Sequence, residues 1–260
     1  MIQKSMVFLC LVCAVNGMFS ANKMRNKADS IMAQVLSHRD QYSASVQQYD
    51  AEVYIKGNSE VKKKNFLFKY ASDYLYLNKN GKNNFVEAWV DMHFSAPNHF
   101  TQNIQALNGN KLNASDIQDR LLQFLNINIY YPTIFDNQII LPGANHAFQY
   151  YQFDYRGAID TLQQTIHEIK ITPKINSPSL ISGIFYIVDG RWTISRFCID
   201  GRWSWYNFHI ETDFGWSDED ILLPVRSDIT FHFNWLGNET VNPHCSLPFI
   251  EVLKDQKYPS

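Results

Sequence analysis

The residues best suited to chemistry form one alternating set in the last third of the chain. His209, Glu211 and Asp213 are spaced two residues apart in a run of strand-forming residues, so their side chains share one face of a predicted strand. A histidine beside two carboxylates has the composition of a general acid–base site. The same alternation is far more common on the solvent-facing side of a sheet, and we favour that interpretation.

Other reactive groups stand in pairs too small to form a site. His167-Glu168 and His244-Cys245 lack further ligands at the spacing that zinc requires. Residues 218–220 lack the alternating ligands and the glycine of an EF-hand. The sequence contains no nucleophile elbow and no phosphate-binding loop. We therefore predict a protein that is not an enzyme, with no metal site and no cofactor.

The stretch at residues 182–200, SGIFYIVDGRWTISRFCID, predicts a hairpin at the centre of the fold. Its first half is a run of β-branched and aromatic residues, and the Asp-Gly pair at 189–190 is typical of a two-residue turn. In the second half the apolar residues change phase between Ile194 and Phe197. That change indicates a β-bulge, which bends a strand and helps a sheet to curve.

The remaining pattern predicts one helix followed by strands. Residues 22–42 place apolar side chains at helical spacing, and Ser115 can cap a short helix at 116–125. Alternation predicts strands at residues 49–57, 85–94, 100–107, 148–155, 165–172, 203–212 and 221–235. The expected fold is a β-rich α+β fold: a curved antiparallel sheet, or half-barrel, with an N-terminal helix and one or two short packing helices.

Two features raise the question of a cavity. Residues 128–147 form an irregular and unusually apolar loop, which either packs on the core, as we favour, or covers a cavity. Five of the six tryptophans lie between residues 192 and 235, where core packing is favoured over an acyl-binding trough or a sugar platform. From alternation alone, the candidate cavity positions are Val53, Ile55, Val90, Met92, Ile184, Tyr186, Trp192 and Phe208.

Charge and the N-terminus limit the partners and the location. The formal net charge of −2 argues against a nucleic-acid partner. The lysine run at 62–64 is interpreted as a solvated loop or edge, with contact to anionic lipid as the alternative. Lys4 and the apolar run at 6–15 predict a signal peptide at residues 1–21, and this run is too short to span a membrane. We expect a single β-rich domain at 22–242 and a tail with little pattern at 243–260.

Removal of the signal peptide leaves two cysteines, Cys198 and Cys245. In an oxidising compartment they either form one disulfide or remain separate thiols, and the sequence leaves both alternatives open.

Several segments resemble a bacterial outer-membrane family that has a domain of unknown function. They are YDAEVYIKG at 49–57, HFSAP at 93–97, AFQYYQFDY at 147–155, IKITP at 169–173, SGIFYIVD at 182–189 and WTI at 192–194. Full-length members carry a carboxypeptidase-regulatory-like domain before this region and a β-barrel after it, and we expect neither part here. The resemblance implies a periplasmic or outer-membrane-associated location without an assigned activity.

The order of elements, with a Pro-x-x-Phe segment at residues 97–100, is also similar to lipoprotein carriers of the LolA/LolB type. That resemblance implies a curved sheet whose concave side is closed by helices and encloses an apolar cavity. The implied partners are a lipid or a lipoprotein acyl chain. The alternative is a structural module that docks to an outer-membrane protein.

Overall fold

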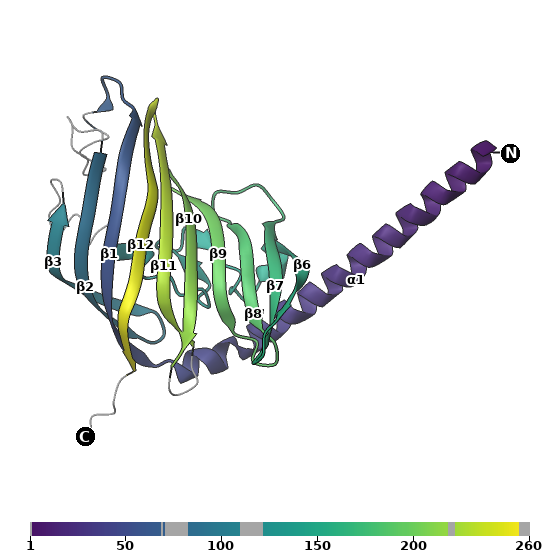
Figure 1. Cartoon of the computed structure of the whole chain (residues 1–260), viewed down its shortest axis with the longest axis horizontal. Helices are drawn as coiled ribbons and strands as arrows, with labels where there is room; N and C mark the ends of the chain where they lie inside the picture. The colour runs from purple at the N-terminus through teal and green to yellow at the C-terminus, as the bar shows by residue number, and fades with distance from the viewer. Residues whose placement is uncertain (1, 69, 71–82, 110–121, 218–221, 255–260) are drawn as a thin grey trace.

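The computed structural model describes residues 2–68, 70, 83–109, 122–217 and 222–254. A sheet of ten antiparallel strands forms the body of the protein, in the order β3-β2-β1-β12-β11-β10-β9-β8-β7-β6 (Figure 1). Its strands are β1 (Gln48–Lys63), β2 (Asn83–Ser95), β3 (His99–Gly109), β6 (Tyr151–Asp160), β7 (Thr165–Pro173), β8 (Ser182–Val188), β9 (Ile194–Trp203), β10 (Tyr206–Trp216), β11 (Leu222–Trp235) and β12 (Asn238–Lys254).

The other elements lie outside this sheet. They are α1 (Ile2–Ser45), the 3₁₀ helix η1 (Leu122–Phe124), the small hairpin β4 (Thr133–Ile134) and β5 (Ile139–Ile140), and α4 (Ala147–Tyr150). The predicted β-rich fold with a curved antiparallel sheet, an N-terminal helix and short packing helices is confirmed.

The strand β12 joins two meanders into one sheet. It pairs with β1 on one side and with β11 on the other, whereas the remaining neighbours are consecutive in sequence. The prediction of a tail with little pattern from residue 243 is therefore wrong as far as Lys254. Two prolines obscured the strand: Pro243 falls at a register irregularity, and Pro248 lies where pairing with β1 is interrupted.

Register shifts bend the sheet, and one of them is the predicted bulge. The β8–β9 register passes from Tyr186↔Arg196 to Ile187↔Ile194, so Ser195 is the extra residue. The predicted two-residue turn is wrong. The connection spans residues 189–192, with positive φ at Gly190 and Trp192. It is closed by a hydrogen bond from the Val188 amide to the Thr193 carbonyl.

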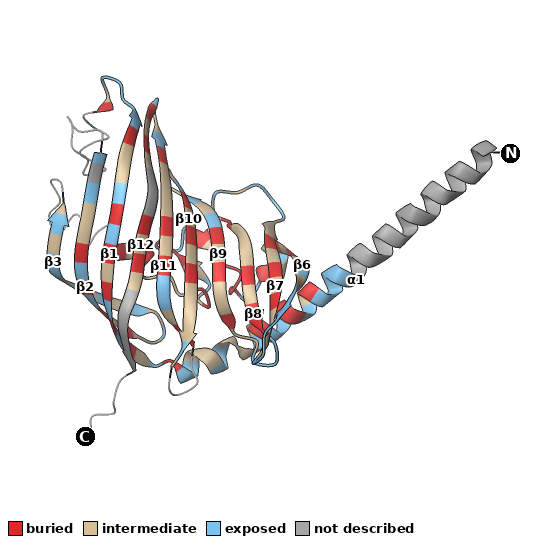
Figure 2. Ribbon diagram, viewed as in Figure 1, coloured by how far each residue is buried: buried red, intermediate tan, exposed pale blue. Residues whose placement is uncertain are grey.

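One face of the sheet, called here the inner face, is covered by α1 and by residues 122–150. Figure 2 shows buried residues alternating with more exposed ones along the strands. α1 buries a stripe at Ala28, Ile31 and Val35 against this face, at the i, i+3, i+7 spacing of an amphipathic helix. The apolar loop at 128–147 packs on the core, as favoured, with Tyr130 and Leu141 buried, and its first residues also line a small cavity.

Some sequence predictions fall outside the described residues. Most of the helix predicted at 116–125 belongs to this group. The signal peptide predicted at residues 1–21 stays a prediction. In the described part of the chain, no helix is both long enough and apolar enough to cross a membrane.

Candidate functional site

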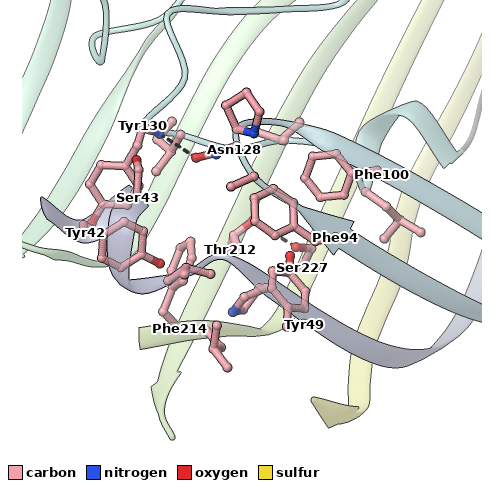
Figure 3. Close-up of a pocket in the computed structure, with 18 of the residues that line it drawn as sticks. Tyr42, Ser43, Tyr49, Phe94, Phe100, Asn128, Tyr130, Thr212, Phe214 and Ser227 are labelled. Atoms are coloured by element: carbon pink, nitrogen blue, oxygen red, sulfur yellow. Dashed lines mark hydrogen bonds between the residues drawn. The ribbon is translucent and has the colours of Figure 1, made fainter. Parts of the chain in front are cut away.

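The candidate site is a small apolar cavity beside the inner face (Figure 3), next to the C-terminal end of α1, which lies at the lower end of the sheet in Figure 1. Its volume is about 50 Å³. The C-terminal end of α1, the β2–β3 turn and the start of β11 form its sides. Residues 124–130, called here the roof, close it against the sheet. The lining side chains used below are those of Tyr42, Ser43, Tyr49, Phe94, Phe100, Tyr130, Thr212 and Ser227.

Two tyrosines fix the helix and the roof to the sheet. The rings of Tyr42 and Tyr130 lie 4.2 Å apart between centroids. The Tyr42 hydroxyl donates to the Leu222 carbonyl at 2.6 Å, and the Tyr130 hydroxyl accepts from the Ile194 amide at 2.6 Å. Burial raises the pKa of both phenols well above their ordinary value, so both stay neutral and neither can act as a base.

A row of three aromatic side chains forms another wall. Tyr49, Phe94 and Phe100 are register partners on β1, β2 and β3. Their ring centroids are 5.0 and 4.9 Å apart along the row. The alternation recognised in the sequence places these side chains on the inner face, because residues two apart on a strand point the same way.

The buried hydroxyl groups of the cavity floor bond to one another. Thr212 and Ser227 are paired across β10 and β11, and their hydroxyl oxygens are 2.9 Å apart. Each hydroxyl group has the other as a partner, so this pair leaves only one further O–H donor for a ligand. The aromatic and aliphatic side chains therefore determine what the cavity can accept, and they suit a hydrophobic group.

The roof has a few direct hydrogen bonds to the sheet. The Gln102 side chain on β3 donates to the Leu122 carbonyl at 3.1 Å and to the Asn126 side chain. Asn128 caps its own segment by accepting from the Tyr130 amide at 3.1 Å. Next to the roof, Arg39 of α1 donates to the Gly143 carbonyl at 2.5 Å.

The cavity positions predicted by alternation do not line this cavity. Most of them are core residues of the inner face: Val53, Ile55, Val90, Met92 and Phe208 are buried in the main cluster, and Trp192 packs against it.

The prediction that Ile184 and Tyr186 share the cavity face is wrong, because their side chains lie on the other side of the sheet. They pair with Cys198 and Arg196 on the opposite face, called here the outer face. The run GIFYIV has no polar residue to mark which side faces out. Sequence reasoning missed Tyr42, Phe94 and Phe100 as lining residues, although it placed all three on the correct elements.

Both cysteines are free thiols. Cys198 lies on the outer face of β9, whereas Cys245 is buried on the inner face of β12 next to Gly57. Two strands, β10 and β11, separate them. Neighbouring strands are about 4.8 Å apart, so the thiols lie far beyond disulfide distance. The alternative of separate thiols is therefore the one realised.

The histidine–carboxylate set lies on the outer face, as favoured. His209 contacts Asp200 at 2.8 Å and Glu211 at 3.1 Å, and Arg196 contacts Glu211 at 2.6 Å and Asp213 at 3.4 Å. His167, the other histidine considered in the sequence, forms an ion-pair contact with Asp189 at 3.0 Å. Residues 218–220 lie outside the described residues. Across the described part of the chain, no three His, Cys, Asp or Glu side chains are arranged to hold a metal ion.

Known structures with a similar arrangement of elements are distant. A LolA superfamily protein from Nitrosomonas europaea matches over 87% of this chain and 94% of its own, with 9% identity and a TM-score of 0.32. A DUF1329 family protein from Desulfovibrio piger matches over 89% and 95%, with 8% identity and a TM-score of 0.35. The expected likeness to LolA-type proteins is thus found, but at these scores it does not bear on function.

Comparison of the sequence with protein families gives a direct match. No curated protein matches the chain closely enough to count as a relative. The model of a family described as "Family of unknown function (DUF5686)" matches residues 31–245, which is most of the chain. This match confirms the expected membership in a family whose function is unassigned. The chain belongs to the DUF5686 family of unknown function.

Proposed function

We propose that this chain is a non-catalytic domain of the bacterial envelope that holds a hydrophobic ligand, such as a lipid acyl chain, between the inner face and the layer formed by α1 and the roof. The location is the periplasm or the periplasmic side of the outer membrane. The observation that supports the proposal is the lining of the cavity: aromatic and aliphatic walls surround one pair of hydroxyl groups that bond to each other.

The size of the cavity sets a condition on this function. Ligand pockets usually measure roughly 300–1,000 Å³, whereas this cavity measures about 50 Å³. In the present conformation it admits only the end of an acyl chain. Binding a longer chain therefore requires the roof to move away from the sheet. Among the described residues, the hydrogen bonds that would have to break are few: the one from the Ile194 amide to Tyr130, and those from Gln102 to the Leu122 carbonyl and to the Asn126 side chain.

A fluorescent fatty acid tests the proposal. Titration with 11-(dansylamino)undecanoic acid is expected to give a saturable, blue-shifted signal that oleic acid displaces. Ser43 lines the cavity from α1, so Ser43→Trp is expected to fill it and lower the affinity by about tenfold or more. Its neighbour Ala44 is exposed on the same helix turn, so Ala44→Trp serves as the matched control and should bind like the wild type.

Two results would contradict acyl binding in this cavity. One is the absence of saturable binding by a folded wild-type chain. The other is equal loss of affinity in Ser43→Trp and Ala44→Trp, which would place the probe elsewhere on the protein.

The open edge of the sheet supports a second candidate, docking to an outer-membrane protein. In the described residues, β3 pairs only with β2, so its other edge presents backbone groups that a partner strand can bind. A photo-crosslinking residue at Asn103, exposed on β3, should then capture one envelope protein. The same residue at Asn207, exposed on the central strand β10, should not. Equal labelling from both positions would argue against docking at the edge.

A further inference from the structure

Three loops meet at the upper end of the sheet, opposite the cavity (Figure 1). They are residues 64–67 after β1, the β9–β10 turn at 204–205 and the β11–β12 turn at 236–237; together they are called here the upper rim. Asn65 donates from its amide to the Asn238 side chain at 2.8 Å and from its side chain to the Leu236 carbonyl at 2.7 Å. The Asn234 amide donates to the Trp205 carbonyl at 3.4 Å. These bonds join the three loops into one surface.

Large apolar side chains project from this surface into solvent. Phe66 is 84% exposed, Leu236 is 60% exposed and Trp205 is 48% exposed. Directly beneath them, Phe68 and Phe233 are buried in a small separate core. The rim is therefore a platform with its own packing, and its exposed apolar groups are not simply unburied parts of the main core.

The backbone conformation of Leu236, at the tip of the β11–β12 turn, supports a role in binding for its exposed side chain. Leu236 has a φ of +47°, in the left-handed region that glycine and asparagine occupy much more readily. A leucine in this conformation stabilises neither the turn nor the core, because its side chain points outward. Residues held in such conformations commonly have a functional role.

Positive charge surrounds these apolar groups. Lys62, Lys63 and Lys64 are exposed beside Phe66, and Arg202 is exposed beside the β9–β10 turn. The carboxylates that contact these lysines are Glu60, 2.6 Å from Lys62, and Glu239, 3.6 Å from Lys63. These four cations and two carboxylates are net positive, whereas the whole chain has a formal charge of −2.

We propose that the upper rim docks on the surface of an anionic lipid bilayer. Phe66, Leu236 and Trp205 would enter the headgroup region, where tryptophan and other aromatic side chains are favoured. The lysines beside Phe66 would then lie at the level of the lipid phosphates. An anionic bilayer satisfies both features at once, because it offers apolar depth beneath a negative surface.

Vesicle flotation tests this docking directly. The purified chain is expected to float with vesicles of phosphatidylcholine containing about 30% phosphatidylglycerol, and much less with phosphatidylcholine alone or in high salt. The paired change Phe66→Ser with Leu236→Asn should lower the bound fraction about tenfold. Because asparagine suits the left-handed turn, this variant should keep the melting temperature of the wild type. Changing Lys62, Lys63 and Lys64 to Gln should remove the preference for anionic vesicles.

Leu162→Asn provides the matched control. Leu162 is fully exposed in the β6–β7 turn at the opposite end of the sheet, so its loss should leave flotation unchanged. All variants keep residues 1–21, so differences between them report on the rim. The proposal is overturned if the wild type does not float with anionic vesicles, if Leu162→Asn loses as much binding as the rim variant, or if the lysine variant keeps the full preference for anionic lipid.

Discussion

The inner and outer faces of strands β9–β11 share one backbone but have different chemistry. On the inner face, Phe197, Ile199 and Phe208 are buried among other apolar side chains. On the outer face, the alternate residues Arg196 and Glu211 form an ion pair whose side chains remain about 43% and 35% exposed. Burial of a large apolar side chain contributes roughly 1.5–3 kcal/mol, whereas an exposed ion pair contributes about 0–1 kcal/mol.

This difference shows where the shape of the molecule is determined. The inner face holds the sheet, α1 and the roof together, and thereby sets the size of the cavity. The outer face keeps the sheet hydrated, and its residues can change without altering the cavity. Three substitutions test this contrast, from the largest expected effect to the smallest.

Truncation of Phe208 should produce the largest effect. Its ring packs edge-on against Phe124 and Phe135 from the layer over the sheet and covers Gly201 on the neighbouring strand. Phe208→Ala should lower the free energy of unfolding by about 3–5 kcal/mol, measured by urea denaturation. A loss below about 1 kcal/mol would mean that the layer over the sheet is not tightly packed.

Removal of one buried hydroxyl should have an intermediate effect. Tyr130→Phe leaves the buried Ile194 amide without its acceptor, and such a group costs about 1–3 kcal/mol. Hydrogen exchange should show faster exchange of this amide together with weaker protection of the roof. Unchanged exchange in this variant would show that the roof is held independently of Tyr130.

The outer-face histidine should have the smallest effect, and one that depends on pH. Partial burial lowers the pKa of His209, but hydrogen bonds to Asp200 and Glu211 and their charges outweigh burial and raise it overall. A raised pKa in the folded state means that protonation favours folding. The contribution is therefore fully present below the ordinary value of 6.5 and is lost as the pH rises through the folded-state pKa.

The comparison of wild type with His209→Gln measures this contribution. We expect a difference in unfolding free energy of less than about 1 kcal/mol at pH 6, because the side chain is partly exposed. The difference should disappear at alkaline pH. A difference that grows as the pH rises would contradict the raised pKa of His209.

The sequence is informative about the fold because strand alternation repeats every two residues. The strands at 49–57 and 85–94 show a clear inner face, and the phase change after Ile194 correctly indicates the bulge. The prolines of β12 hid a central strand because proline normally interrupts a ladder.

The cavity was harder to predict, for two physical reasons. Its lining joins residues that are distant in sequence, such as Tyr42 and Tyr130, and no local pattern records their contact. In addition, both faces of β8 are apolar, so alternation could not place Ile184 and Tyr186.

Native mass spectrometry of the gently purified chain tests the central claim most directly. We expect a fraction of the wild-type protein to carry one added mass in the range of a lipid or fatty acid, and Ser43→Trp to lack it. Delipidated wild type should regain a single adduct when oleic acid is added. A folded wild type that shows only its bare mass, both as purified and after addition of oleic acid, would contradict a hydrophobic ligand site between the sheet and α1.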